Sequence, residues 1–434
     1  MDLAIKIYNN KDLRKRIMFL MICLMIYKVG MHITVPWVNV DVLGGIGDGQ
    51  GALSLVNSFN GGALANFSIF AVGIMPYITA SIIIQLLQMD VVPKLVEWKN
   101  QGEMGRKKIK KLTFKVTIFI AIAQSLGMSF GFNKIYPGLV QNESLSVYLL
   151  IALVLTLGTV VLVIMGEYID KRGIGKGISM IILGGILISL PNSLAMYYDT
   201  EFTNVGDALF ISIIKTILLV MFVYSLLIAI IIINGGERRV PIQHNTAGKM
   251  NMMKNFLPIK INSSGVIPVI FASALIMIPM TIAELSGGKV STFLNNYMSY
   301  TSVSGMILYA LIIIGFTYFY AFIQMDPKVL AKNLQDSGSH VPSIRPGQDT
   351  EFYFKKILIR LTLVGSVFLS VVAIAPMVLG TVVNLPQQLA FGGTSIIIIV
   401  SVIVDLKSQI TSTLAGNNYS AIVKKVPKRK IFGK

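Results

Sequence analysis

The sequence predicts an all-α polytopic membrane protein, with ten transmembrane helices in two inverted five-helix halves around a central pore. Composition is the first indication. Of 434 residues, 54% are hydrophobic and 13% are charged, with a mean hydropathy of +0.71, far from the values of soluble domains. The second is a series of apolar segments, each near the roughly 20 residues that cross a bilayer. The third is the placement of basic residues in alternate connections.

Ten segments are long and apolar enough to be spans. The first contains Lys28 and lacks a small-residue cleavage site, so we do not interpret it as a signal peptide. The only cysteine, Cys23, lies within it and leaves the redox compartment undetermined. In chain order the predicted spans cover residues 17–36, 68–88, 113–132, 147–166, 177–195, 209–233, 264–284, 304–324, 357–378 and 390–406.

The net charge of +18 predicts how the chain is oriented in the membrane. Most of the 38 Lys and Arg residues lie before the first span, after the last span, or in every second connection. The opposite connections contain only Lys134 and Lys289. This alternation follows the positive-inside rule, which puts both termini in the cytoplasm. The basic residues therefore need no nucleic-acid partner to explain them.

A short repeated motif supports the division into two halves. Five spans per half mean that the halves insert in opposite directions, as in an inverted repeat. The second span contains Gly73-Ile74-Met75-Pro76, and the second span of the other half contains Gly265-Val266-Ile267-Pro268. Paired spans interrupted by Gly and Pro point to a central site between repeats. The predicted units are residues 1–200, residues 201–423 and a basic tail at 424–434.

The segment from Asn57 to Leu87 predicts a conduit. Its Gly-rich first part is too short to span, and its second part is an apolar run with Gly, Pro and polar residues of its own. Such interruptions are tolerated in a membrane only where they are buried in protein or line an aqueous path. We expect the two parts to divide at about Phe67. The first part is then a short plug, and the second a helix that faces the conduit.

Two long connections on the predicted cytoplasmic side, at residues 234–263 and 325–356, are polar and rich in turn residues. Connections longer than about 15 residues are usually functional or disordered. No nucleotide-binding motif accompanies them, and no carboxylate lies in the middle of a predicted span. The energy for transport is therefore expected from a partner that docks on these connections.

Other chemistries fit the sequence less well. Gly45-Ile46-Gly47-Asp48 and Tyr198-Asp199 have the form of aspartyl intramembrane proteases, but both lie outside the predicted spans and in the wrong order. The three histidines, His32, His244 and His340, lack metal-ligand spacing. A secondary transporter for a small solute stays open as the alternative, because backbone carbonyls also bind Na⁺. We expect no enzyme activity, metal or cofactor.

Several motifs together resemble the bacterial SecY family, and they follow in the family's order. They are FSIFAVGIMPYITASIIIQLL (67–87), GEMGRKK (102–108), GEYIDKRGIGKGISMII (166–182), ERRVPIQ (237–243), LPIKINSSGVIPVIFASALI (257–276), SIRPGQDT (343–350), RLTLVG (360–365) and FGGTSIIIIVSVIVD (391–405). The resemblance implies a channel in the bacterial cytoplasmic membrane that conducts unfolded secretory polypeptides. It implies a lateral gate, between the second and seventh spans, that releases apolar segments into the lipid bilayer. It also implies as partners the small subunits SecE and SecG, the motor ATPase SecA, the ribosome, signal peptides and nascent chains.

The resemblance also assigns residues to roles. An apolar ring would close the pore, because a narrow apolar constriction excludes water and ions; its members are Ile78, Ile82, Ile182, Ile186, Ile270 and Ile398. The plug would span residues 57–66 and include Asn57, Gly61, Gly62, Leu64 and Asn66. The lateral gate would include Pro76, Thr79, Gln85 and Pro268, with hydrogen bonds between helices helping to hold it shut. The motor and the ribosome would dock at Arg238, Arg239 and Arg345.

Two residues depart from the family pattern. Lys176 stands where Asn is common, and His244 stands where Tyr is common. Both lie in predicted cytoplasmic connections, so they bear on partners rather than on the channel. An accessory family member dedicated to particular substrates is compatible with them, but the retained pore and loop motifs favour the general form.

Overall fold

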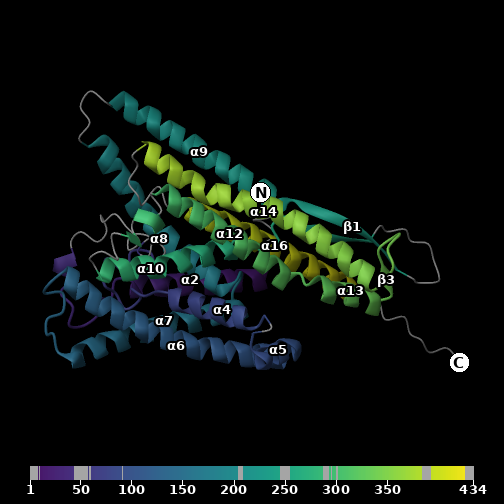
Figure 1. Ribbon diagram of the computed structural model, residues 1–434, viewed down its shortest axis with the longest axis horizontal. Coiled ribbons are helices and arrows are strands. Elements are labelled where there is room, and N and C mark those ends of the chain that lie inside the picture. Colours follow the sequence, from purple (N-terminus) through teal and green to yellow (C-terminus); the bar gives the residue numbers. More distant parts are fainter. Residues whose placement is uncertain are drawn as a thin grey trace.

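The computed structural model describes residues 8, 10–43, 57, 60–89, 91–203, 209–244, 255–286, 293–294, 296–299, 302–383 and 392–425. These residues form a bundle of inclined helices with a small sheet at one end (Figure 1). The first half supplies α2 (Lys11–Gly30), the 3-10 helix η1 (Val40–Leu43), α4 (Met75–Leu87), α5 (Pro93–Asn100), α6 (Gly102–Ile135), α7 (Leu145–Arg172) and α8 (Gly177–Phe202). The second half supplies α9 (Leu209–Gly235), α10 (Ile267–Ser286), α12 (Val303–Gln324), α13 (Pro327–Asp336), α14 (Gln348–Val383) and α16 (Gly392–Lys425).

Seven of the described helices are long and apolar enough to cross a membrane, namely α6, α7, α8, α9, α12, α14 and α16. At the other three predicted spans the structure has α2, which begins with charged residues, and the shorter apolar helices α4 and α10. The number of ten membrane-crossing helices therefore stays a prediction. The predicted boundary between the halves, at residue 200, falls in the last turn of α8.

The second predicted span is wrong at its start. The helix begins at Met75 instead of residue 68, and residues 60–74 form buried turns with a short bridge from Ser68 to Thr34. Gly73 has a left-handed backbone (φ 63°), which ends any helix that approaches from the N-terminal side. Pro76 then occupies the first turn of α4, where its missing N–H costs nothing. The division expected at Phe67 thus lies at Met75.

Parts of the two long connections form strands, so the all-α prediction misses a small sheet. β1 (Glu237–His244) pairs antiparallel with β2 (Asn255–Lys260) and with β3 (Ser339–His340), in the order β2-β1-β3. The pairing of Gln243 with His340 joins the two connections directly. Val240 on β1 is buried in a separate apolar cluster with Ile259, Val341, Phe354 and Ile357. The strands, α13 and α5 lie at the same end of the bundle (Figure 1).

The main apolar core is shared by the two halves. Its buried members come from α2, α4, α7 and α8 on one side and from α9, α10, α12, α14 and α16 on the other. A second cluster belongs to the first half alone and includes Val35, Leu64, Phe67, Phe132 and Leu139. The turns at residues 60–74 lie between these two clusters, because Ala63 belongs to the first and Leu64 to the second.

Candidate functional site

The helices α4 and α10 begin with the same backbone conformation. Gly73 and Gly265 are both left-handed, with φ of 63° and 66°. Each glycine is followed three residues later by a proline in the first turn of the helix. The first helical hydrogen bonds correspond as well: Ile78 N donates to Ile74 O at 3.2 Å, and Ile270 N donates to Val266 O at 3.3 Å. Ile78 and Ile270 thus occupy equivalent positions, two residues after the proline.

The structure brings the six predicted ring isoleucines into one buried cluster. Four of them, from four different helices, line one cavity: Ile78 of α4, Ile182 of α8, Ile270 of α10 and Ile398 of α16. Tyr27, Asn60 and Ser273 are also in its wall. Ile82 and Ile186 lie one turn further along their helices and are buried without lining the cavity.

The cavity has about 20 Å³ of space for a water-sized sphere. That is room for about one water molecule and far too little for an extended peptide. Two of the lining helices, α4 and α8, belong to the first half, and two, α10 and α16, belong to the second half. The described conformation is therefore closed at this point. A separation of the halves would widen the constriction directly.

The predicted plug packs against this cavity, and the most buried polar residue among its described residues is Asn60, which lies within the predicted range but was not singled out. Asn60 is 3% exposed, lines the cavity, and donates from Nδ2 to Ala71 O at 2.9 Å. A Cβ at Gly73 would collide with its Oδ1. An Asn-Gly pair marks a turn in sequence, but only the structure shows that this asparagine faces the ring.

The other plug residues shape the turn around Asn60. Gly62 N donates to Asn57 O at 2.8 Å, and Ala65 N donates to Asn57 Oδ1 at 2.9 Å. Gly61 (φ 67°) lies against α8, where an added Cβ would be 3.0 Å from Gly185 O. Leu64 is fully buried in the second cluster, while Asn66 is only half-buried. Residues 58 and 59 of the predicted plug lie outside the described residues.

The predicted gate helices α4 and α10 contact each other, and α10 also contacts α6. Pro76 and Pro268 fix the helix starts. Thr79 and Gln85 do not hydrogen-bond to α10 among the described residues. Thr79 Oγ1 donates to Met75 O at 3.1 Å, and Gln85 Nε2 donates to Ser81 Oγ at 2.9 Å, both within α4. The expected bonds between these two helices are therefore wrong for these residues.

Gln85 nevertheless faces the opposite half. Its Oε1 is buried without a partner at hydrogen-bonding geometry among the described residues, and the Tyr320 hydroxyl of α12 lies near its amide. Tyr320 in turn packs edge-on against Phe271 of α10, with ring centroids 5.5 Å apart. The contact between halves at this level is thus mainly aromatic and apolar.

The three predicted docking arginines are exposed at the sheet end of the bundle. Arg238 and Arg239 are on β1. Arg239 Nε is 2.8 Å from Glu237 Oε1, and its guanidinium lies 4.7 Å over the ring of Phe256. Arg345 is in the turn before α14, where its carbonyl accepts a hydrogen bond from Thr350 Oγ1 at 2.8 Å. Its side chain has no ion-pair partner among the described residues.

Lys176, one of the two residues that depart from the family pattern, forms an ion pair with the second half of the chain. Lys176 precedes α8, and its Nζ is 3.9 Å from Asp405 Oδ2 on α16. Gly175 N also donates to Gln409 Oε1 of α16, at 2.7 Å. These contacts border a cavity of about 330 Å³ between the starts of α8 and α10 and the middle of α16. For His244, the other departure, the backbone pairs with Ser339.

The structure adds nothing in favour of the protease motif. Asp48 lies outside the described residues, and Asp199 accepts hydrogen bonds from Thr203 near the end of α8. A buried carboxylate that the sequence analysis missed is Glu201, in the last turn of α8. Its Oε2 is 3.5 Å from Lys215 Nζ of α9. Among the described residues no three His, Cys, Asp or Glu are grouped to hold a metal ion.

These features define a class: a helical integral membrane protein whose two halves meet at a closed apolar constriction. The chain belongs to the SecY family, whose profile matches residues 68–407. It is 45% identical over 424 residues to the protein translocase subunit SecY of Halalkalibacterium halodurans, covering 96% of this chain and 98% of the relative. It is 44% identical over 421 residues to the same subunit of Bacillus subtilis, covering 95% and 97%.

Solved structures share the fold. A structure described as a protein-conducting channel superposes with a TM-score of 0.62 at 19% identity, covering 96% of this chain and 95% of that chain. Canine Sec61, from a ribosome-channel complex of the endoplasmic reticulum, superposes with a TM-score of 0.59 at 18% identity, covering 96% and 95%. The resemblance seen in the motifs is thus confirmed over nearly the whole chain.

Proposed function

We propose that this SecY-family protein is the channel subunit of a protein translocase. Its ten helices surround a pore through which unfolded polypeptides cross the membrane. The proposal rests on the narrow cavity that Ile78, Ile182, Ile270 and Ile398 line. Each half contributes two of these side chains, so the opening depends on how the halves are placed. Aliphatic walls offer a passing chain no hydrogen bonds, which suits a channel that accepts many sequences.

The same ring of isoleucines explains how the closed channel blocks ions. An apolar constriction with room for about one water molecule is dewetted, so ions lose their hydration there. The plug supports the closed ring from one side through Asn60, which lies in the cavity wall and holds Ala71 O. Ile82 and Ile186 extend the apolar zone by one helical turn. We assign the ring, the plug and the gate helices α4 and α10 these roles in this protein.

We further propose that the sheet end faces the cytoplasm, together with both termini, in the bacterial cytoplasmic membrane. The joined segments around β1 and β3 present Arg238, Arg239 and Arg345 on that side. SecA and the ribosome are the proposed partners there, with SecE and SecG as the small membrane subunits. The protein acts as a channel and not as an enzyme, so the partner supplies the energy.

Crosslinking a stalled secretory chain tests the channel. A photoreactive residue at Ile78, Ile182 or Ile270 should crosslink to the chain. The same residue at Leu157 should not, since Leu157 is 55% exposed on the outer surface of α7, facing lipid in the proposed arrangement. A transporter for small solutes would give no crosslink at any of the ring positions. Absence of crosslinks at all three, with the chain engaged, contradicts the proposal.

The docking surface has a test of its own. Arg345→Glu reverses an exposed charge that has no ion-pair partner among the described residues, so it should leave folding unchanged. If SecA docks there, the substitution should lower SecA-driven transport severalfold. Lys99→Glu, an exposed charge on α5 outside both long connections, is the matched control. A wild-type rate for Arg345→Glu would remove this residue from the docking surface.

A further inference from the structure

A cavity of about 330 Å³ lies next to the isoleucine constriction, between the starts of α8 and α10 and the middle of α16. These are three of the four helices that supply isoleucines to the constriction. Among the described residues, two charged side chains line it: Lys176, just before α8, and Asp405, on α16. The remainder of the wall is apolar, glycine, serine or glutamine. The ring and the plug give this charged pair no role.

The cavity lies on the side of the constriction that faces the sheet. Lys176 comes six residues before Ile182, and Asp405 comes seven residues after Ile398. At 1.5 Å per residue, each offset is about 10 Å along the helix. The start of α10, which also lines the cavity, follows seven residues after β2 ends. A polypeptide that arrives from the proposed cytoplasmic side therefore passes this pair before it reaches the ring.

The backbone that carries Lys176 is fixed against α16. Ile174, two residues earlier, is buried in a small apolar cluster with Leu13 of α2 and Ile410 of α16. Gly175 N donates a hydrogen bond to a glutamine side chain of α16 at 2.7 Å. Because the backbone is held, the lysine side chain stays at the cavity although most of it is exposed.

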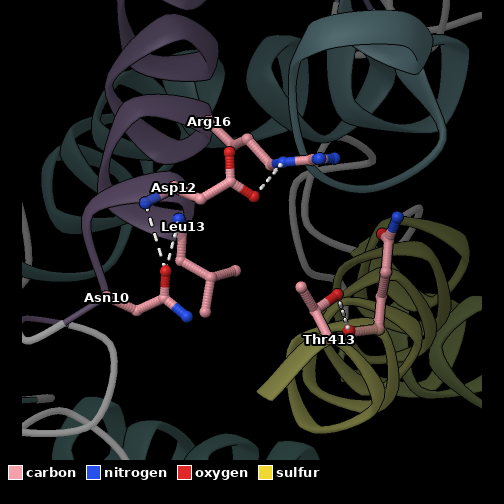
Figure 2. A network of polar contacts seen from close by, with 6 residues as sticks. Asn10, Asp12, Leu13, Arg16 and Thr413 are labelled. Carbon is pink, nitrogen blue, oxygen red and sulfur yellow. Dashed lines mark hydrogen bonds and ion pairs between the residues drawn. The ribbon is translucent and has the colours of Figure 1, made fainter. Parts of the chain in front are cut away.

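Other charged residues nearby do not contribute to the wall of the cavity among the described residues. Arg16 Nε is 3.1 Å from Asp12 Oδ2 on α2, and Figure 2 shows this pair together with Thr413 of α16. Asp170, near the end of α7, accepts a hydrogen bond at 2.6 Å from the first backbone N–H of α8. The described wall therefore has a net charge of zero, from one lysine and one aspartate.

These two charges face each other across the boundary between the halves. Lys176 Nζ is 3.9 Å from Asp405 Oδ2, and the side chains are 63% and 56% exposed. Both therefore act through water on a chain in the cavity. Even in water, one unit charge about 10 Å from another changes a rate by about twofold. The aspartate alone would favour the passage of basic segments through the ring and hinder acidic ones, and the lysine offsets that effect.

We propose that Lys176 determines which segments the channel accepts. It offsets Asp405, so that basic and acidic segments of a secretory polypeptide reach the ring with similar ease. Without the lysine, the cavity would carry one net negative charge beside an apolar constriction that excludes water. This inference rests on the proposed channel function and adds to it the kind of substrate segment that passes.

Matched substrates test the charge preference. One secretory precursor is made in three forms, with lysine, glutamate or glutamine at the same positions of a mature segment. Motor-driven transport of each form into proteoliposomes is measured at low salt, with the full-length protein and its membrane subunits. The result for each variant is the ratio of the lysine rate to the glutamate rate. A change in the amount of active protein, in motor docking or in closure of the channel affects both rates alike and leaves this ratio unchanged.

The two single variants should shift the ratio in opposite directions. Lys176→Asn should raise it about fourfold, because the lysine substrate gains about twofold and the glutamate substrate loses about twofold. Asp405→Asn should lower it by a similar factor. Lys176→Asp with Asp405→Lys keeps the net charge at zero and should keep the wild-type ratio. Both shifts should shrink at high salt, which screens charges about 10 Å apart.

The matched control is Lys99→Asn, which removes an exposed charge on α5 that does not line the cavity and should keep the wild-type ratio. Equal ratios in the wild type, Lys176→Asn and Asp405→Asn would overturn the proposal. So would the same shift in the control, which would assign the effect to the overall charge of the protein. A wild type that transports none of the three substrates would overturn the proposed channel function, and this inference with it.

Discussion

The starts of α4 and α10 have the same backbone conformation but are held by different neighbours. Before α4, the left-handed Gly73 packs on Asn60, a residue of the plug that belongs to no long helix. Before α10, a chain of polar side chains fixes the approach to Gly265. Asn234 of α9 donates to Ser401 of α16 at 3.1 Å, and Asn262 donates to Asn234 at 2.9 Å. Ser264 donates to Asn262 at 3.2 Å.

Because of this difference, we expect the segment before α4 to move more readily than the segment before α10. The network before α10 connects two long helices of the second half, so it moves only with that half. The support before α4 is a run of turns in which the side chains of Asn57 and Asn60 hydrogen-bond to residues 65 and 71 of the same segment, so these bonds do not tie it to a helix of the second half. Segments that move are drawn from the least stable parts of a fold. We therefore expect the plug side to open while the start of α10 keeps its shape.

Removing the plug should change the resting ion conductance more than any other variant in this comparison. A deletion of residues 57–66 takes away Asn60 and Leu64, leaving one side of the constriction without its support. Resting ion conductance in planar bilayers should rise severalfold. Gly62→Ala is a control for backbone strain within the same turn: its φ of 90° favours glycine, but the added methyl group meets no atom within 4 Å, so this variant should lose stability without a rise in conductance. Unchanged conductance of the deletion variant would remove the plug assignment.

A pair of glycine substitutions sharpens the comparison at single residues. Gly73→Ala and Gly265→Ala both put a side chain on a left-handed backbone, which costs about 1–2 kcal/mol. Only the methyl group at residue 73 collides, because it meets Asn60, whereas residue 265 has nothing within 4 Å. Both variants should therefore lose stability. Gly73→Ala alone should raise resting conductance, by less than the plug deletion does.

Thermal unfolding and single-channel recording on the same preparations check this pair. Equal conductance in the two variants would mean that Asn60 does not hold the closed state, although the geometry places it in the cavity wall. Increased conductance from Gly265→Ala alone would reverse the comparison. In that case the start of α10 would be the movable side.

The sequence predicted which two spans correspond, but it did not place their helix starts. Gly73 and Gly265, with prolines three residues later, marked the pair, because few residues other than glycine adopt that backbone conformation. The family motifs placed all six isoleucines in what proved to be one cluster. Hydropathy alone placed the helix start seven residues too early, since the turns at 68–74 are as apolar as a span.

The parts that could not be predicted depend on contacts between distant segments. The sheet joins Gln243 to His340, and a two-residue strand leaves no pattern in a sequence. The partner of Asn60 lies 11 residues further along the chain, and the partner of Glu201 lies on the next helix, α9. Thr79 appeared to be a polar gate residue, but a helical threonine readily bonds its own backbone four residues earlier.

The smallest effect on transport is expected from the ion pair between Lys176 and Asp405, which links the two halves. The Lys176 and Asp405 side chains are 3.9 Å apart and more than half exposed, and such pairs contribute about 0–1 kcal/mol. Lys176→Asn removes the pair, and Lys176→Asp with Asp405→Lys restores it in reverse. If the pair helps to hold α8 against α16, transport should be slightly faster in the first variant and normal in the second, with the difference lost at high salt. Identical rates in both variants at low salt would show that the Gly175–Gln409 bond, and not the ion pair, joins these helices.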